Sequence, residues 1–225
     1  MRILISGEIS KYYKALSQYN YEIILTQKNT NLDCRTSYHS DLQVLRLKNN
    51  IIFVLNNNNY EFDDLKTVYT EKTPTNLYPN DCLLNCLILG CKVFCLIKGI
   101  DIKLKKYLIE NDYELINVKQ GYSKCSVLKL NENAIITADI NIAEKAKENG
   151  IDVLLISQGD IELADYDYGF IGGASAVIEN KVFFFGNINL HSDANIIFDF
   201  INKYNMEIVC LSDDKLNDIG GFVEL

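Results

Sequence analysis

Short apolar runs separated by polar turns recur along the chain, and the clearest example lies between residues 170 and 211. There the apolar runs 174–178 and 182–185 flank the polar turn 179–181, a pattern that predicts a β-hairpin. Downstream, Ser192 is placed to cap a helix, because its hydroxyl can accept an unpaired backbone N–H of the first helical turn.

The helix expected after Ser192 ends at Asn205, and a third strand follows at residues 207–211. Its apolar residues recur at helical spacing and form one face, which comprises Ile196, Ile197, Phe200 and Ile201. The segment therefore predicts a β-β-α-β unit. Such a unit cannot bury its apolar faces alone.

The same order of elements is predicted three more times upstream and once across the two ends of the chain. First strands are expected near residues 41, 83, 126, 174 and 222, a period of about 45 that is typical of stacked repeats sharing a core. The other predicted elements are strand 2–5, helix 9–19, strand 21–25, strands 42–47 and 51–55, helix 60–65, strand 66–69, strands 83–89 and 92–97, a helix capped by Asp101, strand 113–118, strands 125–130 and 134–137, a helix capped by Asp139 and ended by Gly150, and strands 151–156 and 222–225.

The unit at the chain ends is split, with strand 222–225 as its first strand and strand 2–5 as its second. Pairing these two strands closes a ring of units and leaves no free sheet edge. We therefore expect an α/β fold of five repeats, formed as a single domain over residues 1–225 and closed by the N- and C-terminal strands.

The formal net charge of −8 argues against a nucleic-acid-binding protein, which would need a basic face. It is compatible with a cationic ligand, although acidic surfaces also serve solubility alone. The sequence shows neither a signal-peptide pattern at Met1 nor a run long enough to span a membrane. We expect a cytoplasmic protein with no membrane partner; the sequence does not indicate an oligomeric state.

Seven cysteines are present, and without a secretion signal we expect reduced thiols. Cys82, Cys86, Cys91 and Cys95 are separated by three, four and three residues, which differs from the paired CxxC spacing of structural zinc sites. We interpret them as small buried apolar residues of a hairpin. No metal and no cofactor is expected.

In a ring of such units, the residues at the start of each first strand converge at one mouth. These residues are 38–41, 80–82, 123–125, 172–174 and 218–221. They include a histidine, thiols and carboxylates. A thiolate can attack an amidine-like carbon, a histidine can transfer protons, and carboxylates can hold a planar cation.

Five β-β-α-β units of this length resemble the pentein fold, the five-bladed α/β-propeller of guanidino-group modifying enzymes. The resemblance covers essentially the whole chain. It implies arginine deiminases, agmatine deiminases, dimethylarginine dimethylaminohydrolase and amidinotransferases as relatives, together with ribosome anti-association factors that share the ring and are not enzymes. It further implies a guanidino-like small cation as ligand.

The resemblance extends to local motifs in a circularly permuted alignment. His39-Ser40-Asp41 resembles the family's His-x-Asp motif, and Cys125 lies two units later, at the family's separation between histidine and nucleophile. The expected catalytic residues are therefore Cys125, His39 and Asp41. The expected substrate-binding residues are Asp81, Gly172, Gly173, Asp218, Gly220 and Gly221.

The match is partial in either alignment. In the permuted one, Ile219 stands where the Glu-Gly-Gly motif has its acid, and residues 170–173 lack the acid of the Phe-x-Arg-Asp motif. Without permutation, Asp41 takes the place of that acid, Cys125 stands where the histidine belongs, and residues 222–225 contain no cysteine.

Two functions stay open: a non-catalytic pentein that binds a small molecule or a protein, and a Cys-dependent hydrolase or transferase. His39 and His191 have a structural interpretation as hydrogen-bonded residues, and Cys125 has one as a buried inert thiol. Lys124 would depress the pKa of Cys125 if the two share a pocket. Cys82 is the competing nucleophile, but Asp81 beside it would raise the pKa of its thiol.

Overall fold

The computed structural model describes residues 1–225 and contains five three-stranded sheets of one topology. In each sheet the middle strand pairs antiparallel with one neighbour and parallel with the other. The first sheet is β17 (Phe222–Glu224), β1 (Arg2–Ile5) and β2 (Glu22–Leu25); the second is β3 (Val44–Leu47), β4 (Ile51–Val54) and β5 (Lys66–Tyr69); the third is β6 (Leu87–Leu89), β7 (Lys92–Cys95) and β8 (Glu114–Asn117); the fourth is β9 (Val127–Asn131), β10 (Ala134–Thr137) and β11 (Asp152–Leu155); the fifth is β13 (Ser175–Ile178), β14 (Lys181–Phe184) and β15 (Glu207–Cys210).

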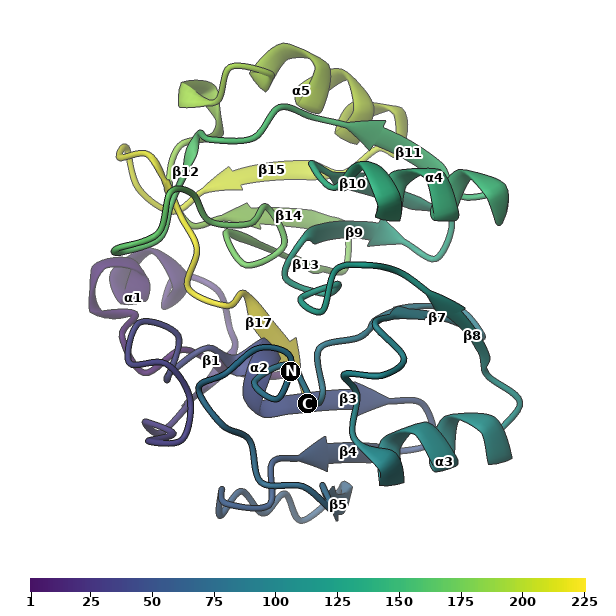
Figure 1. Ribbon diagram of the computed structural model, residues 1–225. Coiled ribbons are helices and arrows are strands. Elements are labelled where there is room, and N and C mark those ends of the chain that lie inside the picture. The colour runs from purple at the N-terminus through teal and green to yellow at the C-terminus, as the bar shows by residue number, and fades with distance from the viewer.

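Four helices connect parallel strands and lie at the periphery of the molecule (Figure 1): α1 (Ser10–Leu16), α3 (Ile102–Glu110), α4 (Ile140–Glu148) and α5 (Ala194–Lys203). The predicted caps of two of them are confirmed. The Asp101 carboxylate accepts from the backbone N–H of Lys103 and Leu104, and Asp139 accepts from that of Ile142. None of the helices is long and apolar enough to cross a bilayer.

The apolar core is divided into clusters that each join two neighbouring sheets. One cluster contains Leu4 and Ile52, a second contains Phe53 and Val93, and a third contains Phe94 and Ile135. A fourth contains Ile136 and Phe184, and a fifth contains Phe183 and Ile3. The contacts therefore run from each sheet to the next and return from the fifth to the first, so that every sheet buries its faces against two others.

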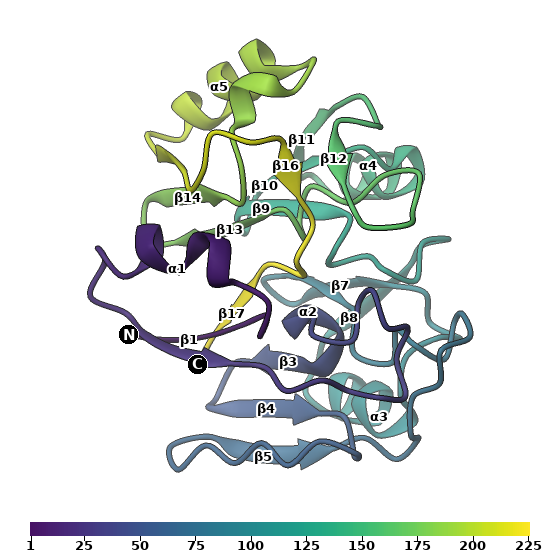
Figure 2. The same ribbon diagram turned by 90° about the vertical axis from the view of Figure 1, so that its left-hand side faces the viewer.

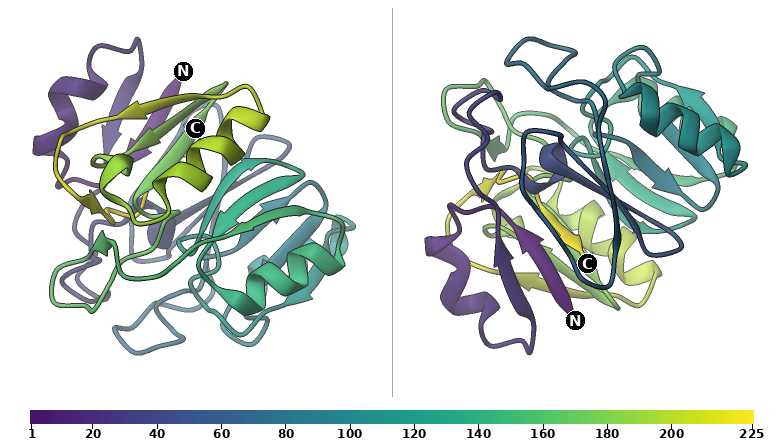
Figure 3. Two further views of the ribbon diagram at one scale, coloured as in Figure 1. Left: turned by 90° about the horizontal axis from the view of Figure 1, so that it is seen from above. Right: turned by 90° about the horizontal axis from the view of Figure 1, so that it is seen from below.

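Strand β17 lies antiparallel to β1, with Leu4 opposite Val223. The two ends of the chain consequently lie side by side, as views from the front, the side, above and below show (Figures 1, 2 and 3). The sequence-based pairing of the terminal strands is confirmed. Strands of different three-stranded sheets do not hydrogen-bond to one another, so the sheets meet through side chains.

The predicted helix at residues 60–65 is wrong, because this segment contains no helix. Side-chain contacts hold it instead. The Tyr60 hydroxyl accepts from the Gln27 N–H at 2.7 Å and donates to Gln43 Oε1 at 2.9 Å. Tyr60, Phe62 and Leu65 are buried against the second sheet. Burial of three apolar side chains outweighs the weak helix preference of so short a segment.

Several further boundaries differ from the prediction. Of the predicted strand 83–89 only Leu87–Leu89 is strand, and the predicted helix 9–19 extends only from Ser10 to Leu16. Helix α5 begins at Ala194 after Asp193, and the Ser192 N–H donates to Asp160 at 2.8 Å, so Ser192 is not the cap. The predicted strand 42–47 starts only at Val44, because the short helix α2 (Ser40–Gln43) precedes it. Gln43 Nε2 donates to the carbonyls of Gln27 and Ser37, which holds this turn in place.

A two-stranded parallel sheet joins β12 (Ile161–Glu162) to β16 (Leu216–Asn217), and a 3₁₀ turn, η1 (Ile188–Leu190), precedes α5. The apolar pattern does not predict this pair of strands, since two residues are too few to show a period. Its position matters because β16 leads into Asp218 and β12 leads into residues 163–170.

Candidate active site

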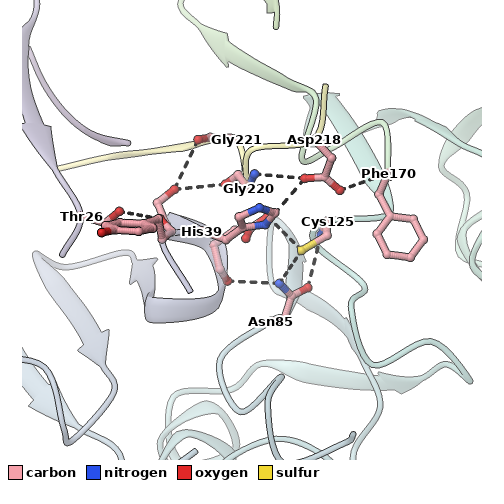
Figure 4. Close-up of polar contacts among 11 residues, drawn as sticks. Thr26, His39, Asn85, Cys125, Phe170, Asp218, Gly220 and Gly221 are labelled. Atoms are coloured by element: carbon pink, nitrogen blue, oxygen red, sulfur yellow. Dashed lines mark hydrogen bonds and ion pairs between the residues drawn. The ribbon is translucent and has the colours of Figure 1, made fainter. Parts of the chain in front are cut away.

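Three separate elements bring His39, Cys125 and Asp218 to one pocket. His39 precedes α2, Cys125 precedes β9, and Asp218 follows β16. Each of the three residues is at most 5% exposed. Figure 4 shows their side chains turned toward one another, with Asn85 below the thiol. The sequence placed these residues in three different units, and the fold brings them together.

The Cys125 thiol is held by two side chains. Its Sγ donates to Asp41 Oδ2 and accepts from Asn85 Nδ2, both at 2.9 Å. Asn85 also donates to the Asp41 carbonyl at 3.1 Å, and its Oδ1 accepts from the Lys124 N–H at 2.8 Å. Cys125, Asp41 and Asn85 therefore form one buried polar cluster, in which Asp41 Oδ1 has no hydrogen-bond partner.

Asn85 was missed by the sequence analysis, and it is completely buried. A signal was present, since it is the polar residue within the apolar run 83–89. A buried amide needs hydrogen-bond partners, so its position in such a run marks a polar cluster.

Burial raises the pKa of the Cys125 thiol well above its ordinary value, and the nearby carboxylates of Asp41 and Asp218 raise it further. The hydrogen bond from Asn85 acts in the opposite direction. The depression expected from Lys124 does not prevail, because burial and the two carboxylates set the direction of the pKa shift, and Lys124 lines a different cavity from Cys125. The thiol is accordingly protonated at neutral pH.

His39 faces a carboxylate. Its Nδ1 lies 3.7 Å from Asp218 Oδ1, which also accepts from the Gly220 N–H at 3.0 Å. The other oxygen, Oδ2, accepts from the Phe170 N–H at 2.9 Å. Burial raises the pKa of Asp218, while the charge of His39 counteracts part of this effect. Asp218 is thus oriented by two backbone donors toward the imidazole.

The glycines expected to bind substrate pack instead against the backbone and side chains of the site. A Cβ on Gly173 would overlap the Asp218 carboxylate, and one on Gly220, whose φ is +79°, would lie 2.5 Å from His39 Cβ. Gly172, Gly220 and Gly221 line a second cavity rather than the pocket of Cys125. The absence of side chains at these positions permits the close approach of His39 and Asp218.

Asp81 does not line the pocket either, but it contacts a residue that does. The Tyr122 hydroxyl donates to Asp81 Oδ2, and Asp81 Oδ1 has no partner. The neighbouring Cys82 donates to the Pro79 carbonyl at 3.1 Å. Burial, aided by Asp81, raises the pKa of the Cys82 thiol. Cys82 does not line the pocket that holds Cys125.

The pocket has a volume of about 250 Å³ and an aromatic wall that the sequence analysis did not identify. The wall consists of Tyr122, Tyr166, Tyr168 and Phe170, with Thr36, Leu42, Leu163 and Asp167 completing the lining beside His39, Cys125 and Asp218. Three of these aromatic residues occupy alternate positions within residues 166–170, and this alternation is the feature of the sequence that could have indicated an aromatic wall. The β12–β16 pair fixes this segment, because the Gly169 N–H donates to the Ile161 carbonyl and the Asp218 N–H to that of Glu162.

A second cavity, of about 470 Å³, lies among the leading strands of all five sheets. Its lining includes Leu45 of β3, Ile88 of β6, Leu128 of β9, Ala176 of β13 and Val223 of β17. Asp41 and Lys124 also line it. Asp41 therefore borders this cavity while its Oδ2 holds the Cys125 thiol.

His191 lies outside both of these cavities. Its Nδ1 accepts from the Asp193 N–H at 3.0 Å, and burial lowers its pKa. This hydrogen bond stabilises the turn that precedes α5, so His191 has a structural role.

Two kinds of enzyme have solved structures similar to this one. A cysteine-to-serine mutant of dimethylarginine dimethylaminohydrolase from Pseudomonas aeruginosa, complexed with citrulline, matches over 95% of this chain and 91% of its own, with a TM-score of 0.57 and 9% identity. Agmatine deiminase from C. jejuni matches over 94% of this chain and 87% of its own, with a TM-score of 0.57 and 11% identity. Both are pentein superfamily members, and the expected pentein fold is confirmed.

A comparison with curated proteins found no match. Among protein families, one described as "Family of unknown function (DUF6873)" matches residues 4–223, nearly the whole chain. The chain therefore belongs to the family DUF6873 and has the pentein fold.

Proposed function

We propose that this protein is a Cys-dependent hydrolase or transferase acting on a small guanidino cation. The observation that carries the proposal is the composition of one pocket, in which the Cys125 thiol and the His39–Asp218 pair share the lining with four aromatic residues. A soft nucleophile, a proton-transfer group and a surface for a planar cation are the parts that this reaction needs.

The pocket suits a guanidinium group. Aromatic faces attract cations, and buried carboxylates bind planar cations through charge-assisted hydrogen bonds. Dimethylarginine dimethylaminohydrolase and agmatine deiminase, which share the fold, act on guanidino compounds according to their names, and the first was solved with citrulline bound. These similarities support the ligand class.

The chemistry proposed for this chain begins with a protonated thiol. A bound cation offsets the carboxylates that raise the pKa of Cys125, and Asp41 Oδ2 is placed to accept the thiol proton. The thiolate then attacks the guanidino carbon. His39 donates a proton to the departing amine, and water hydrolyses the resulting thiouronium to a ureido product and the free thiol. In a transferase, an acceptor amine replaces that water.

The proposed architecture is a five-bladed α/β-propeller whose blades are the five sheets. The cavity bordered by β3, β6, β9, β13 and β17 would be its axis. The seven unpaired thiols are in keeping with a reducing compartment, and we propose the cytoplasm.

A second candidate function is ligand binding without catalysis. It is favoured by the bonds of Cys125, which join the thiol to Asp41 and Asn85 rather than to His39. In such a protein the aromatic pocket would bind a small cation and the thiol would be part of the wall.

Turnover separates the two candidates. The native protein is incubated with arginine, agmatine and methylated arginines, and ureido product and released amine are quantified while intact mass is recorded after acid quench. The proposed enzyme forms product and a mass adduct on Cys125. Saturable ligand binding with neither product nor adduct would establish the binding protein instead.

In the folded protein, iodoacetamide is expected to alkylate Cys125 only at alkaline pH. Its raised pKa leaves little thiolate at neutral pH, and the reactive fraction increases about tenfold with each pH unit until the pKa is reached. Exposed Cys34, Cys91 and Cys210 serve as internal references. Labelling followed by peptide mass spectrometry from pH 6 to 10 checks this; rapid labelling of Cys125 at pH 6 would contradict it.

A further inference from the structure

The pocket that contains Cys125 is lined by two carboxylates and by no lysine or arginine. Asp218 is 3% exposed, like Cys125, so these two residues mark the base of the pocket. Asp167 is exposed, as is Tyr166 beside it, so these two residues mark the mouth. Negative charge is therefore present at both ends of the pocket.

One arginine lies near the mouth, but its charge is already matched. Arg35 donates to Asp33 through Nε at 2.6 Å and through Nη2 at 2.5 Å. This pairing lowers the pKa of Asp33 to about 2, so both partners stay charged at neutral pH. The Arg35 guanidinium lies 4.3 Å from the centre of the Tyr166 ring without lining the pocket.

The Arg35–Tyr166 contact has a chemical consequence for the pocket. It shows that a ring of the aromatic wall accepts a guanidinium within the protein itself. Because Arg35 is held by Asp33, it is not available to bind a carboxylate entering the mouth. A ligand with a terminal carboxylate would meet Asp167 and no free basic side chain of the lining.

We propose that Asp167 is a specificity-determining residue that selects guanidino compounds with a second positive charge at the far end. This inference rests on the proposed function, since it assumes that the guanidinium occupies the base of the pocket. The preferred class is a guanidino amine, and a guanidino acid of the same length is disfavoured. Asp167 lies at the rim of the pocket, and its negative charge attracts or repels the terminal group of the ligand.

The test compares three ligands that differ only in the terminal group: 4-aminobutylguanidine, butylguanidine and 4-guanidinobutyrate. Binding is measured by calorimetry on the full-length Cys125→Ser protein, which removes turnover from the measurement. The amine is expected to bind about tenfold more tightly than butylguanidine, and the acid more weakly than both, since two charges near a protein surface interact by about 1 kcal/mol or more.

Two substitutions isolate the role of Asp167 in this background. Asp167→Asn should remove the preference for the amine, and Asp167→Lys should reverse it in favour of the acid. Asp165→Asn is the matched control, because Asp165 is exposed on the same loop but does not line the pocket. Its φ of +59° is also one that asparagine accepts. The preference should persist in this control and weaken at high salt.

The outcomes are distinguishable. Equal binding of the three ligands, or a preference unchanged by Asp167→Lys, overturns the role of Asp167 and leaves the proposed function standing. Binding by none of the three ligands overturns both. Reversal by Asp167→Lys, with the Asp165→Asn protein behaving as the parent, supports the assignment.

Discussion

Replacing Cys125 with serine is expected to lower kcat for a guanidino substrate by about 1000-fold or more, because loss of a covalent nucleophile removes the reaction path itself. Serine is smaller and less nucleophilic, yet it can keep the contacts of the thiol by donating to Asp41 and accepting from Asn85. Steady-state kinetics and ligand binding on the same protein check this: kcat should fall while affinity for the guanidino ligand is retained.

Cys82→Ser is the matched control for that experiment. Cys82 is as buried as Cys125 and also has a raised pKa, but it lies outside the pocket and donates to the Pro79 carbonyl. Its replacement should leave kcat within about twofold of the parent, since it touches none of the proposed reacting groups. Equal losses in the two variants, or full activity of Cys125→Ser, would remove Cys125 from the role of nucleophile.

Deleting residues 220–225 is expected to destabilise the whole protein by roughly 5 kcal/mol or more, since truncation of even one buried phenylalanine costs about 3–5 kcal/mol. The deletion removes β17 from its antiparallel partner β1 and takes away the buried side chains of Phe222 and Val223. It also leaves β1 as an open sheet edge. Because domains have total stabilities of about 5–15 kcal/mol, most of the protein should be unfolded or aggregated.

Thermal and urea unfolding followed by circular dichroism measure this loss. Glu224→Ala is the control, because Glu224 belongs to the same strand but is exposed. It should change the midpoint by no more than a few degrees. A truncated protein that unfolds at the temperature of the parent would show that β17 does not hold the first sheet to its neighbours.

The sequence by itself determined most of the strands and the pairing of the two chain ends. The strands Arg2–Ile5, Lys66–Tyr69 and Ala134–Thr137 begin and end where the apolar pattern predicted. Helix starts at Asp101 and Asp139 were equally predictable. These features depend on side-chain alternation and on capping hydrogen bonds between residues that are close in sequence. Such local interactions can be recognised from the order of residues alone.

Local pattern failed where tertiary contacts outweigh local preference. Residues 60–65 have the spacing of a short helix, but Tyr60 bonds to Gln27 and Gln43, which come from distant segments. The β12–β16 pair is likewise formed by two residues on each side that have no periodic signal. In both cases the conformation is stabilised by contacts with segments that are distant in sequence, and the local pattern does not reveal such contacts.

For the site, the sequence selected His39, Asp41 and Cys125 through the repeat, but the tertiary structure alone decided what surrounds them. It brought Asn85 and Asp41 within hydrogen-bond distance of the Cys125 thiol and Asp218 next to His39. It also brought four aromatic residues into the lining of the pocket. It also determined the sign of the Cys125 pKa shift. Lys124 is adjacent in sequence, yet burial and two carboxylates dominate, since electrostatic effects depend on distance and solvent exposure in space rather than on sequence separation.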